Sequence, residues 1–237
     1  ACVEFTSIGD KPYLIVDGEW FEENEKAIFS SYALIDAIGM RNLLEQIGTI
    51  NETQINNFKN TINHIASEYK EYFFLTYADS VIIKSNWIPK GKDYDKTYQP
   101  EILLNVIKKI FTSFKFVFNL DAYAIITQGA NQVMGNSNFG ISAQNNHIFF
   151  SSLGAHFAEL FEIESVVRKN IKKEIHSRKN LYLSNSFFLT LHFRKYEQQN
   201  KLKESIINYI SDKQVSFEHA YLPINLDEIS EYLIFSD

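Results

Sequence analysis

Two apolar stretches of this sequence each contain a single aspartate, and this combination limits what the chain can fold into. Residues 31–40 read SYALIDAIGM, with Asp36 near the end, and residues 72–83 read YFFLTYADSVII, with Asp79 in the middle. Each pattern predicts a strand with its aspartate at a strand end or a turn. A carboxylate in so apolar a setting costs free energy unless it is paired, hydrogen-bonded or bound to a cation. On neighbouring strands, the two aspartates would form a place for a divalent metal and so for phosphate chemistry.

The composition is that of a globular protein with a sizeable core. The chain has 237 residues, of which 45% are apolar, enough for one large domain or one domain with an appendage. The net charge of −6 gives no electrostatic reason to expect nucleic-acid binding. The single cysteine, Cys2, excludes an internal disulfide framework and fits a reducing compartment. With no apolar run long enough to span a bilayer, we expect a cytoplasmic protein.

The periodicity of apolar residues predicts alternating helices and strands. A short strand and a turn, with Asp17-Gly18 as the hinge, are predicted over residues 13–21. Further strands are predicted over residues 27–38, 72–83 (two strands that turn at Asp79), 122–127, 147–152 and 181–191, with another near Tyr232. Helices are predicted after Gly39, after a cap at Asn51 or Thr53, and over residues 101–118, 154–172 and 202–211. Residues 131–146 are rich in Asn, Gln, Ser and Gly and predict a loop or a hairpin end.

This order of elements predicts a fold of the α+β class. It is the split βαβ, or ferredoxin-like, pattern with additions, which implies an antiparallel-rich sheet with helices packed on one face. We expect one domain over residues 1–190 with its core at about 27–185, an extra N-terminal strand, and a C-terminal extension over 191–237 packed on the same domain. In this topology the first core strand lies beside the hairpin, so Asp36 and Asp79 converge at one edge of the sheet.

Five short motifs, in order along the chain, resemble those of class III nucleotidyl cyclase-like domains. They are SYALIDAIGMRNLLE from residue 31, YFFLTYADSVII from residue 72, AIITQG at 124–129, GAHFAELFEIES at 154–165 and SRKNLYLS at 177–184. Their combination is more specific than any one of them. Within the family, the pattern is most similar to the bacterial pyrimidine nucleotide cyclases of anti-phage signalling.

The resemblance implies a site for two divalent ions, Mn²⁺ or Mg²⁺, that grip a nucleoside triphosphate. It assigns Asp36 and Asp79 as the catalytic metal ligands, with the carbonyl of Ala37 as a third ligand. The backbone N–H groups of Gly39 and Met40 open the first helix and are expected to hold the β- and γ-phosphates. In such enzymes the activated ribose 3′-hydroxyl attacks the α-phosphate and pyrophosphate leaves.

The chain also departs from the family pattern. Leu75 stands where a lysine reads the base, Ala158 and Glu162 stand where an asparagine and an arginine serve the ribose and the transition state, and Tyr123 replaces an arginine. Either the site takes a different base and uses other cations, or catalysis is lost and a nucleotide pocket or only the fold remains. The candidate replacement cations are Arg178, Lys84, Lys90 and Lys92.

Several of these residues have a simpler structural interpretation. Asp36 could instead cap the following helix, and Asp79 could be a β-turn residue. Arg41 is interpreted as a solvated helix residue or a phosphate contact, and Ser80 as a support for the aspartates or a turn residue. Glu164, like Glu159, is interpreted as an exposed or interface carboxylate.

The functional hypothesis is a metal-dependent nucleotidyl cyclase that makes a 3′,5′-cyclic mononucleotide and pyrophosphate, with a pyrimidine substrate and a role in anti-phage defence. Its expected partners are a nucleoside triphosphate, a second copy of the chain in a homodimer, and an effector that responds to the cyclic nucleotide. The alternative is an inactive cyclase-like module for nucleotide sensing or interaction. A third possibility is a metal-dependent polymerase or phosphotransferase that uses the same aspartates.

Overall fold

The structure is a computed structural model in which the following residues are described: 3–8, 11–16, 19–22, 28–48, 51–70, 72–77, 79–87, 100–131, 140–144, 147–151, 155–174, 179–184, 187 and 221–228. Predictions that fall elsewhere, among them the helix over 202–211, the strand near Tyr232, and the residues Arg178, Lys90 and Lys92, lie outside these residues.

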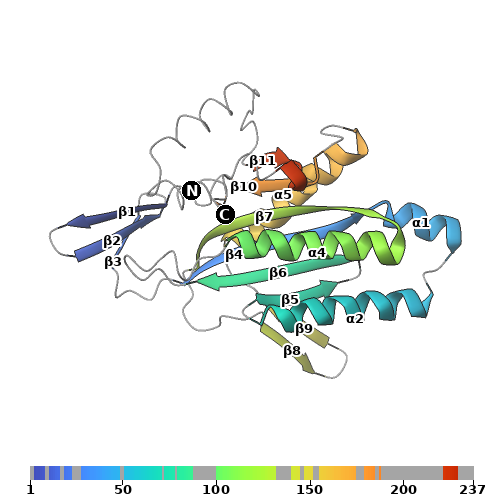
Figure 1. Cartoon of the computed structure of the whole chain (residues 1–237). Coiled ribbons are helices and arrows are strands. Elements are labelled where there is room, and N and C mark those ends of the chain that lie inside the picture. The colour runs from blue at the N-terminus through green and yellow to red at the C-terminus, as the bar shows by residue number, and fades with distance from the viewer. Residues whose placement is uncertain are drawn as a thin grey trace.

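A six-stranded sheet forms the centre of the molecule (Figure 1), in the order β11-β10-β7-β4-β6-β5. Its strands are β4 (Ile28–Ile38), β5 (Tyr72–Tyr77), β6 (Ser80–Trp87), β7 (Asp121–Asn131), β10 (Leu181–Ser184) and β11 (Tyr221–Ile224). Strands β10 and β7 are parallel, and the other neighbours are antiparallel. The helices are α1 (Met40–Ile47), α2 (Glu52–Glu68), α4 (Pro100–Phe118) and α5 (Ala155–Lys172), followed by a short 3₁₀ turn, η2 (Leu226–Glu228).

The α+β fold class is confirmed by the order of the strands. Strands β4, β5, β6 and β7 follow one another along the chain and lie in the sheet as β7-β4-β6-β5. This is the ferredoxin-like arrangement, with α1 and α2 after the first strand and α4 before the fourth. Strand β4 pairs with the β5–β6 hairpin through β6, as the sequence predicts.

Helices cover both faces of the sheet, so the prediction that they pack on one face is wrong. Helices α2 and α4 bury one face, and α5 buries the other. The reason lies in β4, where every residue from 30 to 37 is buried. Alternate side chains of a strand point to opposite faces. Ala33 and Ile35 therefore join the α2 and α4 side, while Tyr32 and Leu34 join the α5 side.

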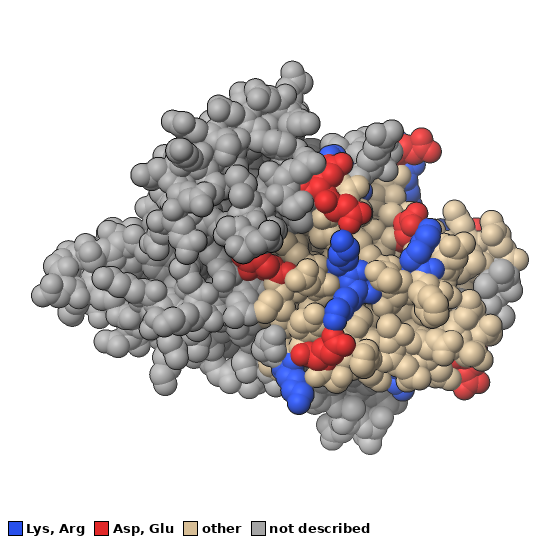
Figure 2. Space-filling model, in the orientation of Figure 1, with Lys and Arg blue, Asp and Glu red and all other residues tan. Residues whose placement is uncertain are grey.

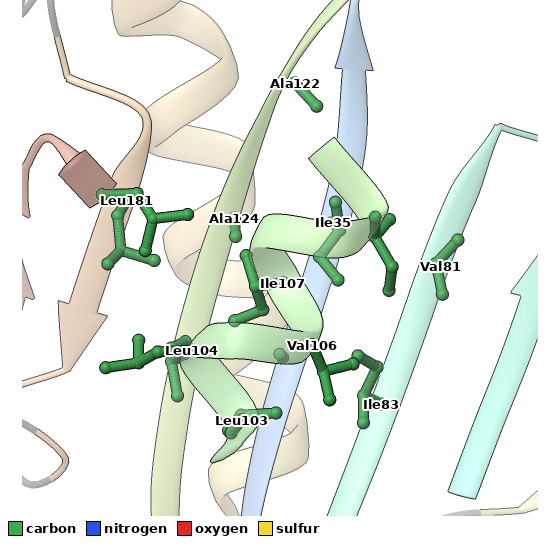
Figure 3. Close-up of a cluster of buried hydrophobic side chains, with 14 of the residues drawn as sticks. Ile35, Val81, Ile83, Leu103, Leu104, Val106, Ile107, Ala122, Ala124 and Leu181 are labelled. Atoms are coloured by element: carbon green, nitrogen blue, oxygen red, sulfur yellow. The ribbon is translucent and has the colours of Figure 1, made fainter. Parts of the chain in front are cut away.

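Helix α4 fills the larger of the two cores. Its residues Leu103, Val106 and Ile107 lie over β4, β6 and β7, where they meet Ile35 and Ile83 (Figure 3). The expected amphipathic helix over residues 101–118 is confirmed, and it begins one residue earlier, at Pro100. Proline is suited to the first turn of a helix, where its missing N–H costs nothing.

The outer face of α4 is charged with both signs. Positive and negative side chains are interspersed on the face seen in Figure 2. Among them, Lys108 lies 3.5 Å from Asp227 and Lys115 lies 3.0 Å from Asp121, while Lys109 pairs with Glu68. Such exposed pairs each contribute little to stability, so we take α4 to be held mainly by its apolar face.

Two smaller sheets accompany the central one. The segment predicted as a strand and a turn over 13–21 contains two strands, β2 (Lys11–Val16) and β3 (Glu19–Glu22), which form a three-stranded sheet with β1 (Val3–Ile8). The polar stretch predicted as a loop or hairpin end contains β8 (Gly140–Gln144), paired with β9 (His147–Ser151). The expected helix cap is confirmed at Asn51, whose side chain accepts a hydrogen bond from the N–H of Gln54 at 2.8 Å.

Helix α5 is fitted closely to β7 at its first turn. A Cβ atom on Gly129 would lie 1.7 Å from Nε2 of His156, so this glycine leaves the space that the imidazole fills. The carbonyl of His156 accepts a hydrogen bond from the hydroxyl of Thr127 at 2.6 Å, and its Nδ1 lies 3.0 Å from Glu159. These contacts set the position of α5, which carries functional side chains described below.

We predict that Gly129→Ala lowers the free energy of unfolding by roughly 1–3 kcal/mol, because overpacking forces neighbours out of place. The matched variant His156→Ala removes the obstructing ring. In urea titrations, the double variant should lose less stability than the sum of the single changes. Strict additivity of the two would contradict the packing described.

Candidate functional site

The two predicted metal ligands lie at the same end of the sheet. Asp36 is close to the end of β4, where it pairs with Ser80 of β6 on one side and with Tyr123 of β7 on the other. Its side chain is buried, and the residue is 6% exposed. Asp79 lies in the turn between β5 and β6, directly before Ser80, and is half-buried. The fold therefore brings together two residues that are far apart in sequence, as predicted.

Three side chains donate hydrogen bonds to the carboxylate of Asp36. The Ser80 hydroxyl donates to Oδ1 at 3.0 Å. The Tyr123 hydroxyl at 3.1 Å and Nη2 of Arg168 at 3.3 Å both lie at Oδ2. Asp36 does not cap the following helix, since the N-cap of α1 is Gly39 and has no side-chain partner. Ser80, which allowed two interpretations, supports Asp36 directly.

A second carboxylate, that of the half-buried Glu164 on α5, belongs to the same network. Its Oε1 lies 3.2 Å from the Tyr123 hydroxyl and accepts a hydrogen bond from Nε of Arg168 at 2.6 Å. A hydroxyl has one hydrogen to donate, so Tyr123 serves one of the two carboxylates at a time. Burial, followed by the charges of Asp36 and Glu164, raises the pKa of Tyr123, so this hydroxyl stays protonated. We call Asp36, Ser80, Tyr123, Glu164 and Arg168 the Asp36 cluster.

The cluster leaves Asp36 short of positive charge. Burial raises the pKa of Asp36, and the negative charge of Asp79 raises it further. The hydrogen bonds from Ser80 and Tyr123 and the charge of Arg168 act in the opposite direction without reversing the shift. An ionised carboxylate in this position is thus costly to the folded protein, and a bound cation would remove that cost.

The other predicted site residues lie at the junction of β4 and α1. Ala37 is buried in β4, and Met40, also buried, is the first residue of α1. Gly39 has a φ of 90° and a ψ of 10°, a left-handed conformation that favours glycine. Arg41 is exposed, and its Nε donates to Glu45 at 2.8 Å, on α1 itself.

The departures from the family pattern have distinct places. Leu75 is a partly buried residue of β5 that packs against the core on the α5 side. Ala158 and Glu162 are exposed on α5, and neither belongs to the Asp36 cluster. Lys84 is buried on β6, with its Nζ 5.7 Å from the centre of the Tyr32 ring.

Sequence reasoning missed Glu164 and Arg168. The sequence pattern favours an exposed or interface position for Glu164, yet its side chain is 14% exposed. The usable signal was the spacing of the two residues, since a glutamate and an arginine four apart on a helix form a pair. What the sequence did not provide was the rotation of α5 that directs this pair toward Asp36.

The carboxylates suit a hard divalent cation. Magnesium ions in proteins are commonly bound by one or two carboxylates together with substrate phosphates, not by a full protein cage. Asp36 and Asp79 could supply such a pair. Within the described residues, no group of three or more His, Cys, Asp or Glu side chains is arranged to hold a metal.

No described helix combines the length and the apolar character needed to cross a membrane.

Comparison with known proteins gives likenesses at the level of structure. No family model and no curated protein matches this chain. A bacterial light-regulated adenylyl cyclase is 11% identical with a TM-score of 0.44, over 73% of this chain and 81% of its own. The adenylyl cyclase CyaB from P. aeruginosa is 12% identical with a TM-score of 0.42, over 69% and 80%. The guanylyl cyclase Cya2 is 11% identical with a TM-score of 0.41, over 69% and 78%.

At these TM-scores, below 0.5, and at identities near 11%, the likenesses carry no argument about activity. The fold class rests on the strand order given above, and the chemistry rests on the Asp36 cluster.

We predict that Asp36→Asn raises the free energy of unfolding at pH 7 by roughly 0.5–2 kcal/mol, the range typical of a single stabilising substitution. The folded state holds the Asp36 proton to a higher pH than the unfolded chain does, for which the reference pKa is 3.8. The stabilisation that protonated Asp36 gives is therefore complete below that value and lost as the pH rises through the folded pKa.

Denaturant titrations from pH 7 to pH 4 should accordingly show the gap between wild type and Asp36→Asn becoming smaller as the pH falls. Asp121→Asn, which removes an exposed carboxylate at the start of β7, is the control and should change stability little. A less stable Asp36→Asn variant at pH 7 would show that the carboxylate is already well compensated.

Proposed function

We propose that this protein is a metal-dependent nucleotidyl cyclase that converts a nucleoside triphosphate to a 3′,5′-cyclic mononucleotide and pyrophosphate. The observation that carries the proposal is Asp36, a buried carboxylate whose pKa is raised by burial and by Asp79 at the same end of the sheet. Such a pair is stabilised by a divalent cation. The five cyclase-like motifs supply the choice of reaction, since they include both aspartates.

The metal ions in this proposal are two Mn²⁺ or Mg²⁺ ions held by Asp36 and Asp79. When bound, they would lower the pKa of the ribose 3′-hydroxyl and offset the charge of the triphosphate. Ser80 and Tyr123 have a positioning role, because their hydrogen bonds fix the orientation of the Asp36 carboxylate. Ligands held in this way lose little entropy on binding a metal.

The peptide groups of Ala37 support its assignment as a third ligand. Ala124 donates its N–H to Asn180, away from β4, and successive residues of a strand direct their peptide groups to opposite neighbours. The backbone N–H and C=O groups of Tyr123 and of its partner Asp36 therefore point toward each other. Those of the next residue, Ala37, point toward the β6 side. Since β6 starts opposite Asp36, the carbonyl of Ala37 is directed past that start, toward the β5–β6 turn.

The beginning of α1 is the proposed phosphate site. Gly39 caps the helix without a side-chain hydrogen bond, so the first N–H groups of the helix, including that of Met40, are available to an anion. The positive end of the helix dipole adds to this attraction. The β- and γ-phosphates would lie here, at residues 39 and 40, which follow Asp36 closely in the chain. Arg41 remains a proposed phosphate contact, and Arg178 a proposed cation of the nucleotide site.

The base and the biological setting are proposed from the resemblance alone. A pyrimidine base is consistent with Leu75, which replaces the lysine that reads the base in ordinary class III cyclases. A role in anti-phage defence, a homodimer, an effector that binds the cyclic product and a cytoplasmic location complete this proposal.

One observation favours the alternative of an inactive nucleotide-sensing module. Arg168, Tyr123 and Ser80 already engage both oxygens of Asp36, and a carboxylate satisfied in this way can serve a purely structural role. In that case a nucleotide would bind without being converted.

The test is incubation of the protein with each of the four nucleoside triphosphates and Mn²⁺ or Mg²⁺, with products identified by mass spectrometry. We expect a cyclic mononucleotide from at least one substrate. Asp36→Ala and Asp79→Ala should each reduce the rate by about 100-fold or more, since a metal supplies several kcal/mol of transition-state stabilisation.

Asp121→Ala is the matched control, because it removes an exposed carboxylate that is paired with Lys115 and is no member of the Asp36 cluster, and it should retain activity. Binding of a nucleotide without product would favour the sensing module. A ladder of longer products would point to a polymerase, and unchanged turnover in both aspartate variants would contradict the proposed site.

A further inference from the structure

Arg168 forms the outer surface of the Asp36 cluster. Its side chain is 55% exposed, whereas those of Asp36 and Glu164, to which it is bonded, are 8% and 14% exposed. Nη2 lies 3.3 Å from Oδ2 of Asp36, and Nε lies 2.6 Å from Oε1 of Glu164. A cation that approaches Oδ2 from solvent therefore meets a positive charge already in place.

The lone pairs of Asp36 limit what can bind beside Arg168. Each carboxylate oxygen offers about two acceptor positions. Oδ2 is contacted by both Tyr123 and Arg168, while Oδ1 is contacted by Ser80. A metal ion that uses Oδ2 must displace one of its two donors.

Arg168 is the donor that can leave. Tyr123 is 3% exposed, and its ring packs edge-on against Tyr182 with centroids 6.4 Å apart, so moving the ring would disrupt the core. Even when its hydrogen turns to Glu164, the hydroxyl oxygen stays 3.1 Å from Oδ2 and occupies that side of the carboxylate. Arg168 reaches the cluster from the surface of α5 by a long side chain with several rotatable bonds, and the link from Nε to Glu164 gives it a second anchor nearby.

We propose that Arg168 is a built-in counter-ion, which occupies the position of a divalent cation at Asp36 in the nucleotide-free protein and is displaced when metal and nucleotide bind. This rests on the proposed function. Once displaced, the guanidinium remains beside the bound ions, where its planar set of donors suits the oxygens of a triphosphate. Arg168 thus opposes metal binding in the empty site and favours nucleotide binding in the filled one.

The proposal predicts effects of opposite sign on the two ligands. In Arg168→Ala, the affinity for Mn²⁺ without nucleotide, measured by electron paramagnetic resonance of the free ion, should increase about 10-fold, within the range of typical coupling between sites. The affinity for a non-hydrolysable triphosphate analogue with Mn²⁺, measured by calorimetry, should decrease by a similar factor. Loss of folding alone would weaken both.

Two further variants separate charge from structure. Arg168→Lys keeps the positive charge and should bind Mn²⁺ nearly as wild type does, while losing part of the nucleotide affinity because an ammonium lacks the planar donor set. Lys169→Ala removes the exposed neighbouring charge on α5 and should change neither affinity.

Unchanged or weaker Mn²⁺ binding by Arg168→Ala would overturn the proposal, as would the absence of Mn²⁺ binding in both proteins. The proposed function fails separately. If the opposite-sign pattern appears but no cyclic product forms, the counter-ion role stands and the cyclase activity does not. If wild type forms a cyclic product and Arg168→Ala binds Mn²⁺ as wild type does, the cyclase activity stands and the counter-ion role does not.

Discussion

The buried carboxylate of Asp36 is the constraint on which the rest of the site depends. It lies at the end of a strand that is buried on both faces, where an ionised group is stable only with partners. The protein supplies Ser80, Tyr123 and Arg168 as partners and still leaves the pKa of Asp36 raised. The nearby charge of Asp79 contributes to that shift. An arrangement that keeps two carboxylates close together at some cost in stability is one that a bound cation completes.

The fold explains why these groups meet. Strand β4 lies between β6 and β7, so its last residues are flanked by the β5–β6 turn on one side and by the start of β7 on the other. Helix α5 covers the face of the sheet to which Asp36 points. From that face, Glu164 contacts Tyr123 and Arg168 contacts Asp36. The close fit of His156 against Gly129 sets where α5 begins, and thereby which of its residues reach the carboxylate.

The sequence predicted the sheet and the aspartate pair, because strands, turns and apolar helices follow from local patterns. It did not predict that α5 lies on the opposite face from α4. The apolar run of β4 lacks the alternation of a half-buried strand, and this was the available indication that both of its faces are covered. Arg168 was not predicted because it is an ordinary charged residue in the helical pattern, and only the rotation of α5 in the folded chain places it at Asp36. The assignments of Gly39, Met40 and Ala37 stay predictions that the backbone arrangement supports.

The central claim is that Asp36 and Asp79 together hold a divalent cation when a nucleoside triphosphate is bound. Crystals grown with Mn²⁺ and a non-hydrolysable triphosphate analogue, measured for anomalous scattering from manganese, test it most directly. The account predicts an anomalous peak about 2.0–2.3 Å from a carboxylate oxygen of Asp36, shared with Asp79, with Arg168 moved from Asp36 to the phosphates. A bound nucleotide with no manganese at Asp36, and with Arg168 still on that carboxylate, would contradict it.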